Sequence, residues 1–231
     1  MKKRRRVLVL VIAAGLVVVG AGWVWVLVRS APSWYSPADA GDAEAAALAE
    51  RAEYRLVEEY HRIRGEGEQW TVRVREEQIN AWLAARLPEW IANREGLSWP
   101  EGVGVPQVHI EEAGINVAVE AEYTGRKQVV VMRVVPEVRE GELWARMDRV
   151  GLGRVSVAGS PAEALAGLIE EAGSEGAMGE EVMEELLKMV SGERGVEWSV
   201  ELADDRRVEL VDVVLSEGAI DVTNRTVRGG K

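Results

Sequence analysis

The sequence of 231 residues contains no cysteine and no phenylalanine, and its only histidines are His61 and His109. Without cysteine the chain forms no disulfide, no thiolate metal site and no cysteine nucleophile. The two histidines are far apart in the sequence, and neither lies in an HExxH pattern, so a transition-metal site has few ligands to draw on. We therefore expect neither a metal nor another cofactor.

Motifs for nucleotide binding and for serine hydrolysis are missing as well. The pair Gly151 and Gly153 is followed by Ser156 where a dinucleotide-binding loop needs a third glycine, and no serine lies in a GxSxG pattern. The abundant acids leave open a carboxylate pair of the glycosidase type, because sequence spacing does not fix the distance between two carboxylates. No pair stands out, and we expect a protein that is not an enzyme.

The start of the chain has the pattern of a membrane anchor. A basic tip, residues 1–6, precedes an uncharged apolar stretch, residues 7–28. As a helix this stretch is about 33 Å long, enough for a hydrocarbon core of about 30 Å. A cleaved signal peptide, the alternative, has a shorter apolar stretch of about 7 to 15 residues. We expect an uncleaved transmembrane helix with an aromatic belt at its outer interface, formed by Trp23, Trp25, Trp34 and Tyr35.

The charges on either side of this stretch predict its orientation. Basic residues favour the cytoplasmic side, so the N-terminus is expected in the cytoplasm and the rest outside it, in the periplasm or beyond. Subtracting the six basic residues up to Arg29 from 28 leaves 22 Lys+Arg against 39 Asp+Glu, a net charge of −17 outside. A surface of this kind repels nucleic acid and anionic lipid head groups. We therefore expect no nucleic-acid partner.

After the anchor we expect a linker at 29–42, an amphipathic helix at 43–64 and an α+β domain at 65–231. The linker contains Pro32 and Pro37. The apolar positions of the helix recur at helical spacing: Leu48, Ala52, Leu56, Tyr60 and Ile63. Packing of this stripe on its own domain and docking of a partner both stay open.

A strand at 70–74 and a helix at 76–93 are expected next, with a kink or restart at Pro88. The apolar side of this helix carries large side chains, namely Ile79, Trp82, Leu83, Leu87, Trp90 and Ile91. Such a stripe either lines an apolar groove between helix and sheet or seals the core. We keep both interpretations.

From residue 108 onward the hydrophobic period changes to two. The expected strands are 108–111, 115–123, 129–135, 143–147, 150–157, 196–202, 208–215 and 220–223. Two helices, at 161–172 and 180–190, interrupt them. The order predicts the α+β class, with a curved antiparallel sheet packed against amphipathic helices.

Asn80 is a polar residue on this otherwise apolar helix. A buried amide costs free energy unless it is hydrogen-bonded, so we expect Asn80 to bond the backbone of a neighbouring strand and fix the helix there. Contact with a ligand is the alternative role.

Two short runs resemble a known group of proteins. The run TVRVREEQINAWL, from Thr71 to Leu83, resembles the strand and "E-x-x-L/I-N-x-x-L" helix that open the YpmS-like envelope proteins, and similar openings occur in the wider tubular-lipid-binding-like group. The run VVPEVREGEL, from Val134 to Leu143, with the later VGLG from Val150 to Gly153, resembles their strand pair. The resemblance covers about residues 70–160.

The resemblance implies a curved sheet wrapped on a long helix, with a lipid or other apolar ligand inside. The chain departs from the group in its acidity, its lack of phenylalanine and its extra helices between 161 and 190. We expect a membrane-anchored, non-enzymatic protein of the cell envelope that binds a lipid or apolar ligand through the stripe from Ile79 to Ile91. The alternatives are an anchored scaffold that binds an envelope protein and no small molecule, and a carboxylate hydrolase.

Overall fold

The computed structural model describes most of the chain beyond the expected anchor. The described residues are 23, 25–39, 41–93, 99, 102–123, 126–156, 160–161, 163, 167, 188, 191–202 and 205–228. The basic tip 1–6, most of the expected transmembrane stretch 7–28, and nearly all of the expected helices 161–172 and 180–190 lie outside them. Among the described residues, no helix is both long enough and apolar enough to cross a bilayer.

The expected amphipathic helix is α2 (Ala43–His61). Its N-cap is Asp42, whose Oδ1 accepts hydrogen bonds from the N–H groups of Glu44 (2.8 Å) and Ala45 (3.3 Å). One side of α2 buries the small residues Ala45, Ala49 and Ala52, which allow another helix to approach closely.

That neighbouring helix is α3 (Glu76–Ala85), which is followed at once by α4 (Leu87–Ala92). Gln78 Oε1 accepts a hydrogen bond from the N–H of Arg75 at 3.0 Å and so satisfies a donor at the start of α3. Pro88 lies in the first turn of α4, where its missing N–H is tolerated. The helix therefore restarts at the proline instead of running through it.

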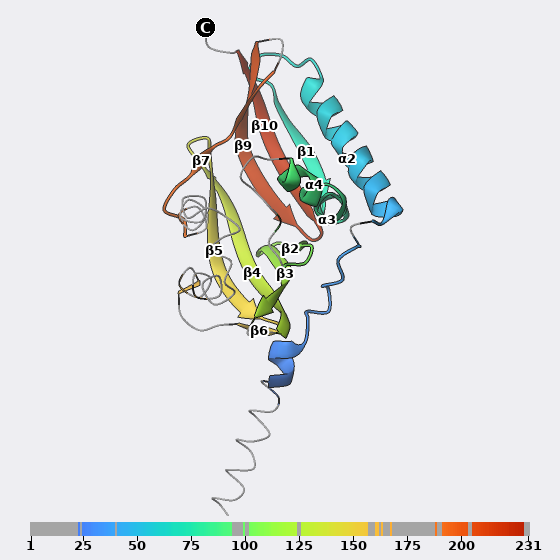
Figure 1. Cartoon of the computed structure of the whole chain (residues 1–231). Coiled ribbons are helices and arrows are strands. Elements are labelled where there is room, and N and C mark those ends of the chain that lie inside the picture. Colours follow the sequence, from blue (N-terminus) through green and yellow to red (C-terminus); the bar gives the residue numbers. More distant parts are fainter. Residues whose placement is uncertain are drawn as a thin grey trace, which may run out of the picture.

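The strands form two antiparallel sheets. Sheet A has the order β1 (Gln69–Arg75), β10 (Ala219–Arg228), β9 (Arg206–Ser216) and β8 (Ser199–Glu201). Sheet B has the order β2 (Gln107–Glu111), β3 (Gly114–Tyr123), β4 (Arg126–Arg139), β5 (Glu142–Leu152) and β6 (Val155–Ser156), and β7 (Val196–Glu197) also pairs with β5. The α+β class and its antiparallel pairing are thus confirmed (Figure 1).

The sequence predicted one sheet, and the division into two has a clear topological cause. The first strand, β1, pairs with the last strand, β10, and not with its sequence neighbour β2. The expected strand at 196–202 is split at Trp198: β7 before it pairs with sheet B, and β8 after it pairs with sheet A. The chain therefore connects the two sheets at this edge.

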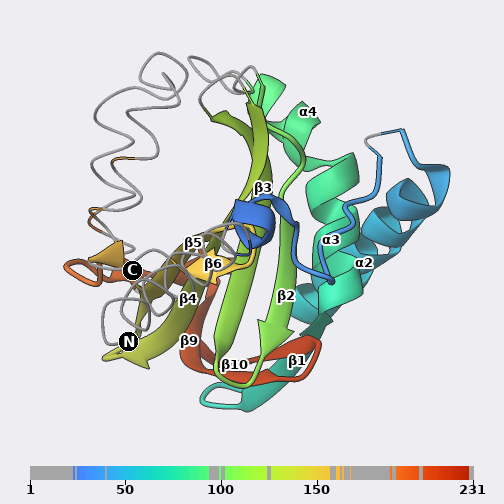
Figure 2. The same cartoon turned by 90° about the horizontal axis from the view of Figure 1, so that it is seen from below.

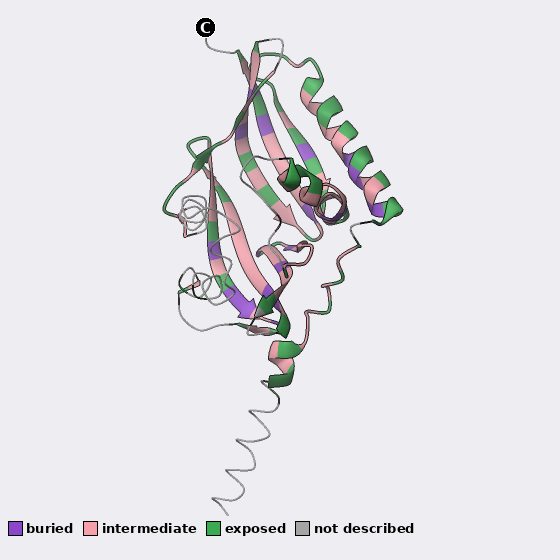
Figure 3. Ribbon diagram, in the orientation of Figure 1, coloured by how far each residue is buried: buried purple, intermediate pink, exposed green. Residues whose placement is uncertain are grey.

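The predicted stripe of α2 is not an exposed surface. Leu48, Leu56 and Tyr60 are half-buried, whereas Ile63, which lies beyond the end of the helix, is exposed. Figure 3 shows the outward side of α2 as mostly exposed and the side toward the domain as more buried. Most of this stripe packs on its own domain.

The C-terminal end of α2 is held on sheet A by an aromatic cluster. The Tyr60 ring meets the rings of Trp70 and Trp198 edge to face, with centroids 5.0 and 6.2 Å apart. The Tyr60 hydroxyl lies 3.5 Å from Oδ1 of Asn224, a side chain with no exposed surface. Burial raises the pKa of Tyr60 to about 12, because its phenolate would lose hydration.

Candidate functional site

The outer edge of β2 is closed by side chains of α3. Asn80 Nδ2 donates to the carbonyl of Val108 at 2.9 Å, and the Val108 N–H donates back to Asn80 Oδ1 at 2.7 Å. One turn earlier, Glu76 Oε2 accepts from the N–H of Ile110 at 2.7 Å. Edge strands carry unpaired backbone groups, so α3 acts here in place of a further strand. The strand backbone expected for Asn80 is that of β2, and Figure 2 shows α3 beside it.

Glu76 also joins the two sheets. Its own N–H donates to the carbonyl of Gly218 at 2.8 Å, and the Gly218 N–H donates to the carbonyl of Ile110 at 3.0 Å. Together with the bond from Ile110 to the Glu76 carboxylate, these contacts close a ring between α3, the β9–β10 turn and β2. Ile110 has no exposed surface, so the ring lies over a dry part of the core.

His109 faces the opposite side of β2 from Val108 and Ile110. Its Nδ1 lies 3.2 Å from Glu76 Oε2, and its ring stacks on that of Trp34, with centroids 5.2 Å apart and planes at 24°. Trp34, expected in the membrane interface, is half-buried on sheet B.

The expected linker is a packed strap, which we define as residues 27–37. The Gln107 amide donates to the carbonyl of Trp34 at 2.9 Å and accepts from the N–H of Ser36 at 2.6 Å. The Tyr35 hydroxyl accepts from the N–H of Glu120 on β3 at 2.9 Å. Burial raises the pKa of Tyr35, and the nearby Glu120 carboxylate adds to this shift. The linker is thus fixed along the outer face of sheet B.

The start of the strap is held by the β5–β6 turn. The N–H of Arg154 donates to the carbonyl of Leu27 at 3.0 Å, and its Nε donates to the carbonyl of Ala31 at 3.1 Å. Gly153 has φ +57°, and a Cβ there would lie 2.6 Å from the carbonyl oxygen of Leu27 and 2.8 Å from that of Ser30. Only glycine suits both this backbone conformation and this close approach.

Residues 25–29, just before the turn of the chain at Ser30, are helical, and Trp23 and Trp25 are exposed. The Arg29 guanidinium lies 3.7 Å from the centre of the Trp25 ring, in cation–π geometry. The interfacial role of Trp23 and Trp25 stays a prediction.

The apolar stripe of α3 is divided between two surroundings. Trp82 packs on the cluster of Ala45, Ala49 and Ala81, and its Nε1 donates to Glu53 Oε1 of α2 at 2.9 Å. This tryptophan therefore belongs to the contact between α2 and α3. At about 100° per residue, Ile79 and Leu83 lie on the side of α3 away from Ala81.

A cleft on the opposite side of α3 shows where Ile79 and Leu83 lie. Glu77, Asn80 and Ala81 line a cleft of about 240 Å³ together with the strap and Gln107, on the outer side of β2. Ile79 and Leu83 point away from the cleft, and we infer that they share the side of Val108 and Ile110. We call this side of sheet B the inner face.

The inner face is only partly sealed. Its pairing register aligns Val117 with Val108 and Met132, and Ile115 with Ile110 and Val134. Val108 and Ile110 are buried, but the long side chains next to them keep partial exposure: Ile115, Val117, Met132 and Val134. Ile79, Leu83, Leu87 and Ile91 are also half-buried, and Trp90 of α4 is 45% exposed.

Two acids of the larger described cleft are paired with arginines. A cleft of about 420 Å³ near β8 and β9 contains Glu197 and Glu209, which pair with Arg207 at 2.7 Å and Arg225 at 3.3 Å. Within the described ranges, no group of three or more Asp, Glu or His side chains converges as metal ligands would.

Sequence reasoning missed the bonding role of Glu76 and the docking role of Gly153. The acid at a helix start was visible, but its partner Ile110 is 34 positions further on. A Gly-x-Gly at a strand end indicates a tight turn, whereas nothing near it in the sequence points to residues 27–31. Neither a family model nor a curated protein matches this chain, so the resemblance over residues 70–160 stays a prediction.

Proposed function

We propose that this protein is a membrane-anchored, non-enzymatic domain that lies outside the cytoplasm and binds a lipid or another apolar ligand. The ligand would lie between the α3–α4 stripe and the inner face of sheet B. The lining would be Ile79, Leu83, Leu87, Trp90 and Ile91, with Ile115, Val117, Met132 and Val134 opposite. Trp82 is left out because it packs on α2.

The observation that carries the proposal is the partial exposure of these apolar side chains. A sealed core buries its large apolar residues at close-packed density. Here the residues with the least exposure include several alanines, while the larger side chains of the α3–α4 stripe keep contact with solvent. Covering them with an apolar ligand would gain about 25 cal/mol per Å² removed from water.

The arrangement of the N-terminal segment supports the anchored part of the proposal. The strap includes the last two of the 22 uncharged residues and is fastened to the domain at both ends, by Arg154 and by Gln107. A domain held in this way would lie directly against the membrane surface instead of on a long tether.

The test is native mass spectrometry with solvent extraction on residues 31–231, purified without detergent. We expect a bound lipid or apolar molecule that is lost in Trp90→Glu. Val214→Glu is the matched control, because Val214 on β9 is exposed to a similar extent, 50% against 45%. A ligand-free protein from several expression hosts, or equal loss in both variants, would contradict the proposal.

A scaffold is the second candidate, and one observation favours it. Tyr54 and Val57 lie one turn apart on the outward side of α2 and are 69% and 55% exposed. An envelope protein bound there would be released by Tyr54→Glu, while ligand binding at the α3–α4 stripe would be unchanged. Quantitative affinity capture of the two variants, Tyr54→Glu and Trp90→Glu, separates the two candidates.

A further inference from the structure

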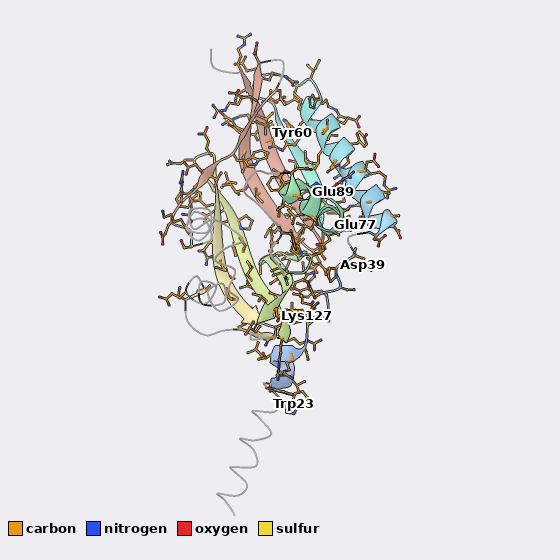
Figure 4. The ribbon with its side chains drawn as sticks, viewed as in Figure 1. Trp23, Asp39, Tyr60, Glu77, Glu89 and Lys127 are labelled. Atoms are coloured by element: carbon orange, nitrogen blue, oxygen red, sulfur yellow. The ribbon has the colours of Figure 1, made fainter. Side chains whose placement is uncertain are left out.

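The end of the domain where the strap begins differs in charge from the rest. This end is formed by the β5–β6 turn, which bonds Leu27 and Ala31 through Arg154, and by the start of β4. Gly153 donates to the carbonyl of Val129, so the start of β4 lies next to that turn. In Figure 4, Lys127 and Trp23 lie at this end and Tyr60 lies at the opposite end.

The described side chains that lie at this end are mainly basic. The exposed cations are Arg29, Arg126, Lys127 and Arg154. The nearby acids are Glu120, which pairs with Lys127 at 2.9 Å, and the exposed Glu122. Cations thus outnumber acids here, whereas over residues 30–231 there are 22 basic residues against 39 acids. Among the described side chains, the usual charge of the domain is reversed where the chain would leave the bilayer.

We propose that this end of the domain binds the head groups of anionic phospholipids. The inference rests on the membrane anchor of the proposed function and is independent of an apolar ligand. Lysine and arginine attract an anionic membrane surface only within a Debye length, about 8 Å at physiological ionic strength. The strap holds Arg154 beside the end of the helical residues 25–29, so its guanidinium lies within that range of a surface crossed by this helix.

The remaining acidic surface gives this contact an orienting effect. An anionic membrane repels the rest of the domain, with its net negative charge, and attracts the basic end. The repulsion and the attraction together keep the domain upright on the membrane. In this orientation the α3–α4 stripe does not lie flat on the head groups. The rigid strap transmits this orientation, since Gly153, Tyr35 and Gln107 hold it along sheet B.

The test uses the full chain in lipid nanodiscs. Because the sequence has no cysteine, one introduced cysteine can be labelled specifically. A fluorophore is attached to Ser156→Cys, an exposed position on β6, and is quenched by nitroxide-labelled phosphatidylglycerol or by equally labelled phosphatidylcholine at the same fraction. We expect several-fold stronger quenching by the anionic lipid, and we expect high salt to reduce the difference. With the orientation of the proposed function, the basic tip at residues 1–6 would face the other leaflet, away from the fluorophore.

Charge variants identify the residues responsible. Arg126→Glu/Lys127→Glu should equalise quenching by the two lipids, and Arg126→Gln/Lys127→Gln should reduce the preference without adding acids. The matched control is Arg62→Glu/Arg228→Glu, which makes the same change in net charge at exposed positions near the opposite end. It should keep the preference.

Three outcomes would overturn the inference while leaving the membrane anchor intact. Equal quenching in the wild-type chain would show no preference for anionic head groups. Equal loss in the control variant would show a response to net charge alone. A chain that enters nanodiscs but is not quenched by either lipid would place this end away from the membrane. A chain that does not enter nanodiscs at all would instead refute the anchor, and with it both proposals.

Discussion

The side-chain amide of Asn80 is paired at both its ends with the backbone of a single residue, Val108. The two bonds are 2.9 and 2.7 Å long and run in opposite directions, as two bonds between neighbouring strands would. Val108 is almost fully buried, so water cannot easily replace either bond. The pairing fixes α3 on the edge of sheet B and decides which side chains of α3 meet the inner face.

Replacing Asn80 with alanine should destabilise the domain by about 3 kcal/mol, because it leaves a buried N–H and a buried C=O without partners. Asn93→Ala, at the exposed end of α4, should cost less than about 0.5 kcal/mol. Urea unfolding followed by circular dichroism measures both. Equal values for the two variants would mean that Asn80 has no role in fastening the helix.

Gly153→Ala should release the start of the strap. A methyl group there meets the carbonyl oxygens of Leu27 and Ser30 and also strains a backbone at φ +57°. Gly141→Ala is the control for backbone strain alone, since Gly141 has φ +85° but no atom within 4 Å of its would-be Cβ.

Two spin labels measure this release, at the exposed positions Ser33→Cys and Arg149→Cys of the full chain in micelles. Double electron–electron resonance should give a narrow distance distribution in the doubly labelled chain and in its Gly141→Ala variant. The Gly153→Ala variant should give a broad one. A narrow distribution in Gly153→Ala would show that the strap does not need this glycine.

The ion pair between Arg133 and Asp148 should make the stability of the fold depend on pH. Two bonds of 2.7 Å join the guanidinium to the carboxylate across β4 and β5. They hold the pKa of Asp148 below its ordinary value of 3.8, with further help from the charges of Arg133, Arg146 and Arg149. A carboxyl group whose pKa is lower in the folded state stabilises the fold above the unfolded pKa and loses this effect as pH falls.

Asp148→Asn should therefore lower stability at neutral pH by about 2 kcal/mol, and the difference from wild type should shrink below about pH 4. The control is Glu66→Gln, in the exposed loop between α2 and β1. Urea midpoints measured from pH 3 to pH 7 give the comparison. A difference that is constant over this range would contradict the assignment of acid sensitivity to this pair.

Tyr60 should titrate apart from an exposed tyrosine. Burial raises the pKa of Tyr60 to about 12. In an ultraviolet titration of tyrosinate, Tyr60→Phe should remove a component near pH 12 that the wild-type chain shows. The raised pKa also means that the contribution of Tyr60 to stability is complete below about pH 10 and is lost as pH rises toward 12.

Local features of the fold were accessible from the sequence. The alternation at 115–123 and the turn at Glu140 and Gly141 predict the hairpins of sheet B, because a hairpin joins residues that are near in sequence. The pairing of β1 with β10 was not accessible, since Val72 and its partner Val222 are separated by most of the domain. The alternation of apolar and polar residues in a strand does not indicate which distant strand it pairs with.

For the candidate site, the sequence predicted which residues form the stripe but not how they are arranged. Helical spacing identified the stripe from Ile79 to Ile91, but it did not separate Trp82, which packs on α2, from Leu83, which points to the other side. That separation depends on the angle at which α2 crosses α3. Trp34 was likewise chosen as an aromatic near the membrane, while its stacking on His109 depends on the path of the strap.

The most direct test of the proposed function is a photocrosslink in the full chain in living cells. A benzophenone amino acid replaces Trp90 in one variant and Val214 in another, and mass spectrometry identifies the adducts after irradiation. The account predicts a lipid or other apolar adduct at position 90 and little at position 214. Adducts only with protein at position 90, or the same lipid yield at both positions, would contradict it.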